Sequence, residues 1–209
     1  VTPTTRLLLV VIVALVATVI ALLARPQRTG SSTAAPTTTQ TPTPTATAAT
    51  AQPTATSVAG VSVGYPDTRD GAQAAAANYT IAYGSDAMFN TNKRHAILDA
   101  IADPTVKPAL QAQLDQSFAA VMARFGLDAA GNPPQGQTFV DRAVPVGVHL
   151  LSYSESKAQV AVWTTGLVGL AGATSTLPVT EAWNTETITL HWIGGDWKWV
   201  AFTQIDGPT

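Results

Sequence analysis

An uninterrupted apolar run near the start of the chain limits what the chain can fold into. Leu7 to Ala24 are 18 residues, of which Thr18 is the only polar one, and they lie between Arg6 and Arg25. As a helix this run would be about 27 Å long, close to the hydrocarbon thickness of a bilayer. A cleaved signal peptide is the alternative, but its apolar region is usually shorter and ends at a small-residue cleavage site. We therefore predict a transmembrane helix at 7–24.

The segment after this run has the composition of an extended stalk. Residues 29–57 contain 12 Thr, 7 Ala and 4 Pro, with no charged residue and no large apolar one. Such a tract cannot bury a core and favours extended, partly polyproline II conformations. We predict a disordered linker over 25–60. Stalks of this kind usually stand outside cells, so we expect a single-pass protein of the cell membrane, with residues 1–6 as a cytoplasmic tail and the C-terminal domain extracellular.

The remaining residues, 61–209, are enough for one domain with a core of its own. They include eight basic and thirteen acidic residues, which gives a formal charge of −5. A nucleic-acid-binding surface needs a basic stripe, so we expect no direct nucleic acid binding. The chain has no cysteine, which excludes disulfides, thiol nucleophiles and thiolate metal sites.

The first half of this domain has the pattern of three helices. Asp67 is a candidate cap for a helix that ends at Gly84, a second helix fits Thr91 to Ala102, and a third, with Thr105 as its candidate cap, ends at Gly126. A spacing of three to four residues predicts the buried face of each helix. These predicted core residues are Ala74, Ala77, Ile81 and Tyr83 in the first helix, Ala96, Ile97, Ala100 and Ile101 in the second, and Leu110, Leu114, Phe118, Val121, Met122 and Phe125 in the third.

The second half has the pattern of an antiparallel sheet. Its four predicted strands lie at about 138–153, 157–170, 179–193 and 196–205. Short connections, including the Gly194-Gly195 turn, make neighbouring strands antiparallel. We therefore predict an α+β domain in which three N-terminal helices pack on a curved four-stranded antiparallel sheet.

Alternation along the last two predicted strands assigns their faces. Ile188 and Leu190 share the face that we expect to pack on the helices, because side chains two residues apart point to the same side of a strand. By the same rule Trp197 and Trp199 share one face of the last strand, and Phe202 lies on the other. Both faces of that strand are apolar.

The tryptophans are candidates for a partner surface, because exposed aromatic side chains mark interfaces. The alternative is that they pack across strands and cap the end of the sheet. The candidate interaction surface consists of Trp192, Trp197, Trp199 and Trp183.

No catalytic, cofactor-binding or metal-binding motif is present. His95, His149 and His191 share no metal-ligand spacing. A cone-shaped domain can hold a cavity between its sheet and its helices. Asp141 and Tyr79 are candidates for an acid–base pair in such a pocket. We assign no catalytic residue, no metal site and no cofactor, and we expect no enzymatic activity.

The order of a short tail, one span, a Thr/Pro stalk, three helices and four curved strands resembles the bitopic assembly-factor subunits of conjugative type IV secretion systems, including the TcpC-type proteins. The stretches VGYPDTRDGAQAAAANYTIAYG and WIGGDWKWVAFTQIDGPT are also similar to uncharacterised membrane-anchored proteins of actinobacteria. The family resemblance implies a cystatin-like cone fold, like that of nuclear transport factor 2 (NTF2-like). It also implies a scaffold that oligomerises and contacts channel subunits, without catalytic residues. This chain has one such domain where TcpC-type proteins have two.

Two main functional hypotheses follow. The favoured one is a non-enzymatic, membrane-anchored scaffold or assembly subunit of a conjugative DNA-transfer or type IV secretion-like channel, whose partners are other membrane or channel subunits and a second copy of itself. The alternative is a stalked extracellular enzyme or small-ligand-binding domain that uses the cone cavity; a cell-envelope protein unrelated to transfer is a third. Polar side chains converging in a deep pocket would favour the ligand-binding alternative, and a cavity filled by Trp and Leu would favour the scaffold.

Overall fold

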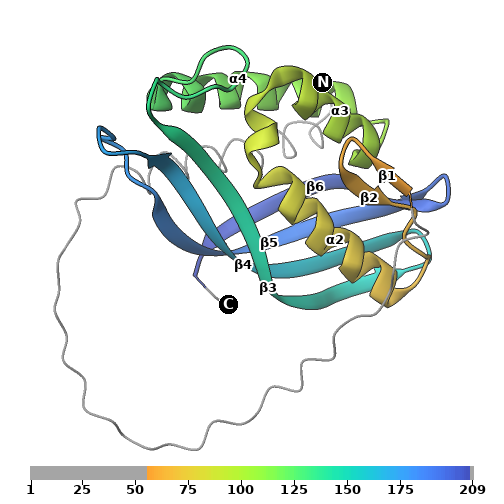
Figure 1. Ribbon diagram of the computed structural model, residues 1–209. Coiled ribbons are helices and arrows are strands. Elements are labelled where there is room, and N and C mark those ends of the chain that lie inside the picture. Colours follow the sequence, from red (N-terminus) through yellow and green to blue (C-terminus); the bar gives the residue numbers. More distant parts are fainter. Residues whose placement is uncertain (1–55, 208–209) are drawn as a thin grey trace, which may run out of the picture.

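The computed structural model describes residues 56–207, in which three helices pack on one face of a four-stranded sheet (Figure 1). The helices are α2 (Arg69–Tyr83), α3 (Thr91–Ile101) and α4 (Lys107–Phe125). The strands of the sheet are β3 (Thr138–Ser154), β4 (Lys157–Ala171), β5 (Thr180–Ile193) and β6 (Asp196–Asp206). The predicted α+β class, with three helices before the four strands of the main sheet, is confirmed.

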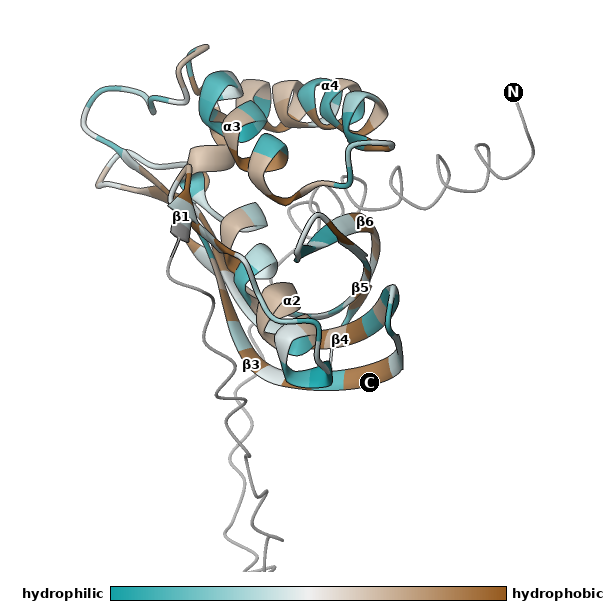
Figure 2. Ribbon diagram, turned by 90° about the vertical axis from the view of Figure 1, so that its right-hand side faces the viewer, coloured by the Kyte–Doolittle hydropathy of each residue, from teal (hydrophilic) through white to brown (hydrophobic). Residues whose placement is uncertain are grey.

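The sheet is a meander in the order β3-β4-β5-β6, with all neighbours antiparallel, as predicted. Gly194 and Gly195 form the two-residue loop between β5 and β6 with φ of 63° and 82°, the left-handed conformations that such a tight hairpin needs. Figure 2 shows the sheet curving around α2, while α3 and α4 lie across one end. The concave face of the sheet therefore becomes the inside of the domain.

Secondary structure in the described residues begins before residue 61, the predicted start of the domain. A short hairpin of β1 (Thr56–Val58) and β2 (Val61–Val63) falls partly inside the predicted linker 25–60. Its three-residue strands are too short to show a periodic pattern, and Ala59 and Gly60, with φ of 52° and 81°, form its turn. A short 3-10 helix, η1 (Asp86–Phe89), was also not predicted.

The predicted tail 1–6, the predicted transmembrane helix 7–24 and the linker up to residue 55 lie outside the described residues. Within 56–207 no helix combines the length and the apolar character that crossing a membrane requires.

Helix α2 is rotated relative to the prediction. Its side-chain cap is Thr68, whose hydroxyl accepts a hydrogen bond from the Gly71 N–H, and not Asp67. Ile81, predicted to face inward, is 49% exposed. A run of alanines carries no hydrophobic contrast, so the periodicity could not fix the buried face. That face consists of Gly71, Ala72, Ala75, Ala76, Tyr79, Thr80 and Ala82.

Helices α3 and α4 follow the prediction more closely. In α3, Ala96 is exposed instead of buried, and Leu98 and Arg94 are buried in its place. In α4 all six predicted core residues are buried, and the helix ends at Gly126 in the left-handed conformation. The helix begins after Val106, so Thr105 is not its cap. Thr105 instead donates hydrogen bonds from its N–H and its hydroxyl to Asp103.

A β-bulge in β6 corrects the predicted faces of the last strand. Leu190 pairs with Trp199, whereas the preceding Thr189 pairs with Ala201, so Val200 is the extra residue. The bulge puts Phe202 on the same face as Trp199, although the two are three residues apart. Both are buried in the core, with exposed fractions of 2% and 3%.

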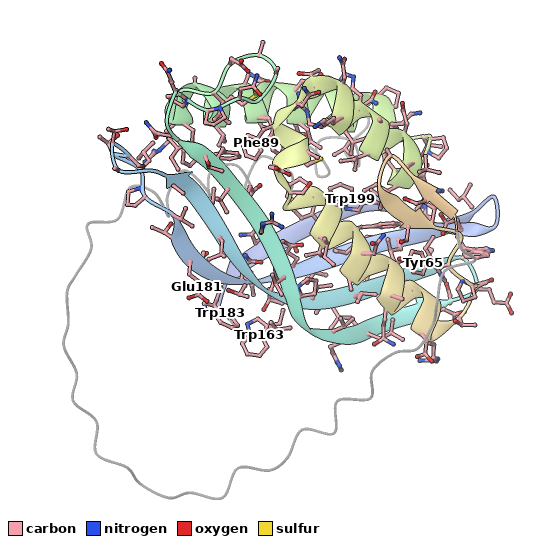
Figure 3. The ribbon with its side chains drawn as sticks, viewed as in Figure 1. Tyr65, Phe89, Trp163, Glu181, Trp183 and Trp199 are labelled. Atoms are coloured by element: carbon pink, nitrogen blue, oxygen red, sulfur yellow. The ribbon has the colours of Figure 1, made fainter. Side chains whose placement is uncertain are left out.

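Aromatic rings hold the helices to the concave face of the sheet. The ring of Tyr83 contacts those of Phe118, Trp199 and Phe202, with centroid distances of 6.1, 5.5 and 4.9 Å. Burial of each such side chain stabilises the fold by about 1.5–3 kcal/mol. Phe89 and Trp199, labelled in Figure 3, lie between the helices and the sheet.

Candidate functional site

The convex face of the sheet carries an exposed aromatic pair. Trp163 on β4 and Trp183 on β5 are 38% and 41% exposed, and their ring centroids lie 5.2 Å apart. Trp163 is directly opposite Thr185 and Trp183 is opposite Thr165, so the two are diagonal neighbours on one face. Figure 3 shows both rings on the side of the sheet away from the helices.

Two aliphatic side chains extend this pair. Val144 pairs with Thr165 across from Trp183, and Ile205 pairs with Thr185 across from Trp163. Val144 is 49% exposed and Ile205 is 50% exposed. We call Trp163, Trp183, Val144 and Ile205 the outer aromatic face.

The predicted interaction surface is corrected by these positions. Trp197 is fully buried and Trp199 is 3% exposed, so neither can contact a partner. The Trp197 indole N–H donates a hydrogen bond to the Pro66 carbonyl at 2.9 Å, and its ring packs 5.3 Å from that of the half-buried Trp192. The alternative of cross-strand packing therefore describes this strand end. Of the four candidates, Trp183 alone belongs to the outer aromatic face.

Trp163 was missed, although its sequence carries a signal. The residues two apart on β4, Ala158, Val160, Val162 and Thr164, are all buried. Alternation therefore places Trp163 on the opposite face, as it does for any residue between two inward positions.

A cavity of about 130 Å³ lies between the helices and the concave face of the sheet. Three small residues create the space: Ala143, Gly166 and Ala182 lie opposite one another on β3, β4 and β5. Its apolar walls include Phe89 and Phe118. The volume is enough for several water molecules or one small organic molecule.

The junction of α2 and β3 positions the polar side chains at this cavity. The Ala143 N–H donates a hydrogen bond to the Gly84 carbonyl at 2.7 Å. A Cβ on Gly84 would lie 2.3 Å from that of Ala143, so only glycine allows this approach. Tyr83 precedes the junction and Asp141 lies two residues before Ala143, and both side chains line the cavity.

A second carboxyl group enters the cavity from β5. Glu186 is 5% exposed, and its Oε2 accepts a hydrogen bond from the Thr80 hydroxyl at 2.8 Å. Burial raises the pKa of Glu186 to about 7 against the opposing effect of that hydrogen bond. Burial, and then the charges of Asp86 and Glu186, raise the pKa of Asp141 to about 7. The two acids are therefore partly protonated near neutral pH and titrate as a coupled pair.

Tyr83 completes this group. Burial foremost, and then the charges of Glu186 and Asp141, raise the pKa of its hydroxyl, so the phenol stays protonated at any ordinary pH. Arg142, an exposed residue on β3, is the one base among the described residues that line the cavity.

Two buried polar atoms in the cavity wall have no hydrogen-bond partner among the described residues. They are Thr164 Oγ1 and Asn184 Oδ1. The two residues are directly opposite each other on β4 and β5, and both line the cavity. Buried polar atoms are satisfied in most proteins, so this pair indicates that water or a ligand completes it.

Of the predicted pocket pair, one residue lines the cavity and the other does not. Asp141 lines the cavity, but Tyr79 does not: its hydroxyl donates a hydrogen bond to the Trp197 carbonyl at 2.6 Å inside the core. Tyr83, one turn further along α2, takes its place. Glu186 was missed, although it continues the inward alternation of Ile188 and Leu190 toward the start of the strand.

Two histidines of the described part of the chain lie beside an acid. His191 Nδ1 lies 3.0 Å from Asp103 Oδ2, and His95 Nε2 lies 2.9 Å from Asp115 Oδ2. Among residues 56–207, no three His, Cys, Asp or Glu side chains gather as a metal site would require.

Comparison with known proteins assigns no family. No protein-family profile matches the chain, and no curated protein matches it. Solved structures that superpose on it include an IcmL-like type IV secretion system protein from Legionella pneumophila, at 12% identity and a TM-score of 0.46, covering 68% of this chain and 95% of that one. The intermembrane space region of the chloroplast protein ARC6 superposes at 12% identity and a TM-score of 0.38, covering 65% and 97%. Overlaps this distant assign no function.

Proposed function

We propose that this chain is a non-enzymatic, membrane-anchored scaffold or assembly subunit of a conjugative DNA-transfer or type IV secretion-like channel. In this proposal residues 7–24 are the membrane anchor, the tail before them is cytoplasmic, and the described domain stands outside the cell. The single observation that carries the scaffold role is the exposed Trp163–Trp183 pair on the convex face of the sheet.

The physical chemistry of this pair suits protein contact. Neither ring helps to fill the core, which lies on the other face of the same strands. Tryptophan is strongly enriched among the residues that dominate binding energy, because a large rigid ring gives up much water contact at little entropic cost. Val144 and Ile205 enlarge the apolar area, as expected at the centre of an interface.

The proposed partners are other channel subunits. The order of anchor, stalk and cone domain, which resembles the TcpC-type assembly factors, supports this class of partner. A second copy of the chain is the other occupant that the face could take.

A pull-down from the native membrane tests the proposal. The tagged full-length chain, extracted in mild detergent, is compared with a Trp163→Ala/Trp183→Ala double variant and with Ile81→Ala, a still more exposed apolar position on α2. We expect the wild type and Ile81→Ala to recover other channel subunits and the double variant to lose them. Recovery that the double variant retains in full would contradict the role of the outer aromatic face. If the wild type recovers no channel subunit, the channel proposal itself fails.

A second candidate function is small-ligand binding in the cavity. The observation that favours it is the convergence of Asp141, Glu186 and Tyr83 with the two unsatisfied atoms of Thr164 and Asn184. No tryptophan lines this cavity, so the space is not filled in the way that the scaffold hypothesis alone would lead us to expect. The two functions use opposite faces of the sheet and are compatible.

A further inference from the structure

We infer that the cavity binds a small organic cation, a primary or substituted ammonium group on an apolar body. This inference rests on the cavity-binding candidate and is independent of the scaffold role. It is carried by three features of the cavity: acceptor oxygens that receive no hydrogen bond from a described residue, acidic groups without a buried cation, and aromatic walls.

Several acceptor oxygens of the cavity wall receive no hydrogen bond from a described residue. Asp141 and Glu186 each present a carboxyl group, and Asn184 Oδ1 is buried without a partner. The one hydrogen bond to Glu186 from a described residue goes to Oε2, which leaves its other oxygen free to accept. An ammonium group brings two or three N–H donors and no acceptor, and so matches this set.

The charge of the site favours a cation. The ionisable groups near Asp141 and Glu186 are Asp86 from η1, Tyr83 from α2 and Arg142 from β3. Arg142 is exposed, and within residues 56–207 it forms no salt bridge with either acid. A bound cation would relieve the repulsion between the acids, whereas an anion would increase it.

The walls favour an apolar body. Tyr83 and Phe89 present aromatic rings to the cavity, beside Val121 and Val168. An ammonium ion over an aromatic ring gains further stabilisation from the ring quadrupole. A bare divalent metal ion fits less well, because the described part of the chain brings no third acidic or histidine ligand to the two carboxyls.

Binding of matched small probes tests the ligand class. The full chain, kept in a non-ionic detergent, is titrated at pH 8 with benzylammonium, with its neutral isostere benzyl alcohol and with benzoate, and empty micelles are the blank. We expect benzylammonium to bind at least about tenfold more tightly than benzyl alcohol, and benzoate more weakly than either. Benzylammonium stays charged between pH 5.5 and 8, so its affinity should fall at pH 5.5, where the two acids hold protons.

Isosteric variants localise the binding. Asp141→Asn and Glu186→Gln should each weaken benzylammonium binding at least about tenfold, while Glu155→Gln, in the exposed β3–β4 turn, should leave it unchanged. Far-UV circular dichroism checks that each variant is folded. If a variant does not fold, the comparison of charged and neutral probes and the pH dependence of the wild type decide the question without it.

The outcomes separate the two levels of the inference. If benzyl alcohol binds as tightly as benzylammonium, the cavity binds ligands but the cation class is overturned. Benzylammonium binding that is unaffected by both cavity variants would place the probe elsewhere and overturn the inference. If no probe binds above the micelle blank, cavity binding and the cation class both fail, and the scaffold role is untouched.

Discussion

The two faces of one sheet use the same residue type in opposite ways. Trp197 and Trp199 lie on the concave face, are buried, and hold the helices and the N-terminal loop to the sheet. Trp163 and Trp183 lie on the convex face and contact chiefly each other among aromatic rings. A tryptophan's role in this domain is therefore decided by the parity and the bulges of its strand and not by its hydrophobicity.

Two glutamates on β5 show the same contrast between the two faces for a charged side chain. Glu181 is exposed on the convex side, where Oε1 accepts a hydrogen bond from the Thr165 hydroxyl at 2.9 Å. Glu186 is five residues further on, so it points to the concave side and is buried. Water stabilises the first carboxylate, whereas the second is desolvated in the cavity wall.

The largest expected effect is on the concave face. Trp197→Ala should lower the free energy of unfolding by about 3–5 kcal/mol, because it opens a large internal void and removes the indole N–H bond to the Pro66 carbonyl. Urea unfolding of the full chain in detergent, followed by far-UV circular dichroism, measures the loss. A decrease below about 1 kcal/mol would mean that Trp197 is not a core residue.

Glu186→Gln should change how stability depends on pH. The pKa of Glu186 is raised from 4.5 to about 7 in the folded state, so between these values the folded protein holds a proton that the unfolded chain has released. Stability of the wild type therefore falls as the pH rises through this window. The variant removes this dependence, and the difference in unfolding free energy between pH 5 and pH 8 should shrink by on the order of 2–3 kcal/mol. An unchanged pH profile in urea titrations would contradict the burial of this acid.

The tryptophans of the convex face should matter much less to stability. Trp163→Ala and Trp183→Ala should each cost about 1 kcal/mol, because each removes contact with the other ring and opens no internal void. In a double-mutant cycle the two losses should not add, since the pair is broken by either change. Single losses above about 3 kcal/mol would show that these rings support the core.

The smallest expected effect is that of Glu181→Gln. Its side chain is exposed and its hydrogen bond to Thr165 can be kept by the amide oxygen. The free energy of unfolding should stay within about 0.5 kcal/mol of the wild type, with the same profile between pH 5 and pH 8. A pH effect as large as that of Glu186→Gln would erase the contrast between the two faces.

The sequence predicted most of the fold because its elements carry strong local signals. Six apolar residues at helical spacing and a terminal glycine fixed α4, and the short turns fixed the order of the four strands. Hydrophobic periodicity gave no answer where neighbouring residues did not differ in hydrophobicity or where a strand was very short. In α2 a run of alanines did not identify the buried face, so the pocket residue was predicted to be Tyr79 when it is Tyr83. The three-residue strands of the β1–β2 hairpin showed no periodic pattern.

The candidate sites were harder to predict because they depend on register. The bulge at Val200 moves every later residue of β6 to the opposite face of the sheet. The local sequence contains no signal that predicts this bulge. Glu186 was recoverable, since it continues the alternation of Ile188 and Leu190. The cavity itself arises from a row of small residues on three strands, and only pairing across strands brings those residues together.

The most direct test of the contrast between the faces is photo-crosslinking in intact cells. A photoreactive amino acid replaces Trp183 in one full-length chain and Ile81, on the exposed side of α2, in another. If the outer aromatic face is the contact surface, position 183 should give a discrete crosslinked product with another channel subunit, and position 81 should not. No product from position 183, or the same products from both positions, would contradict it.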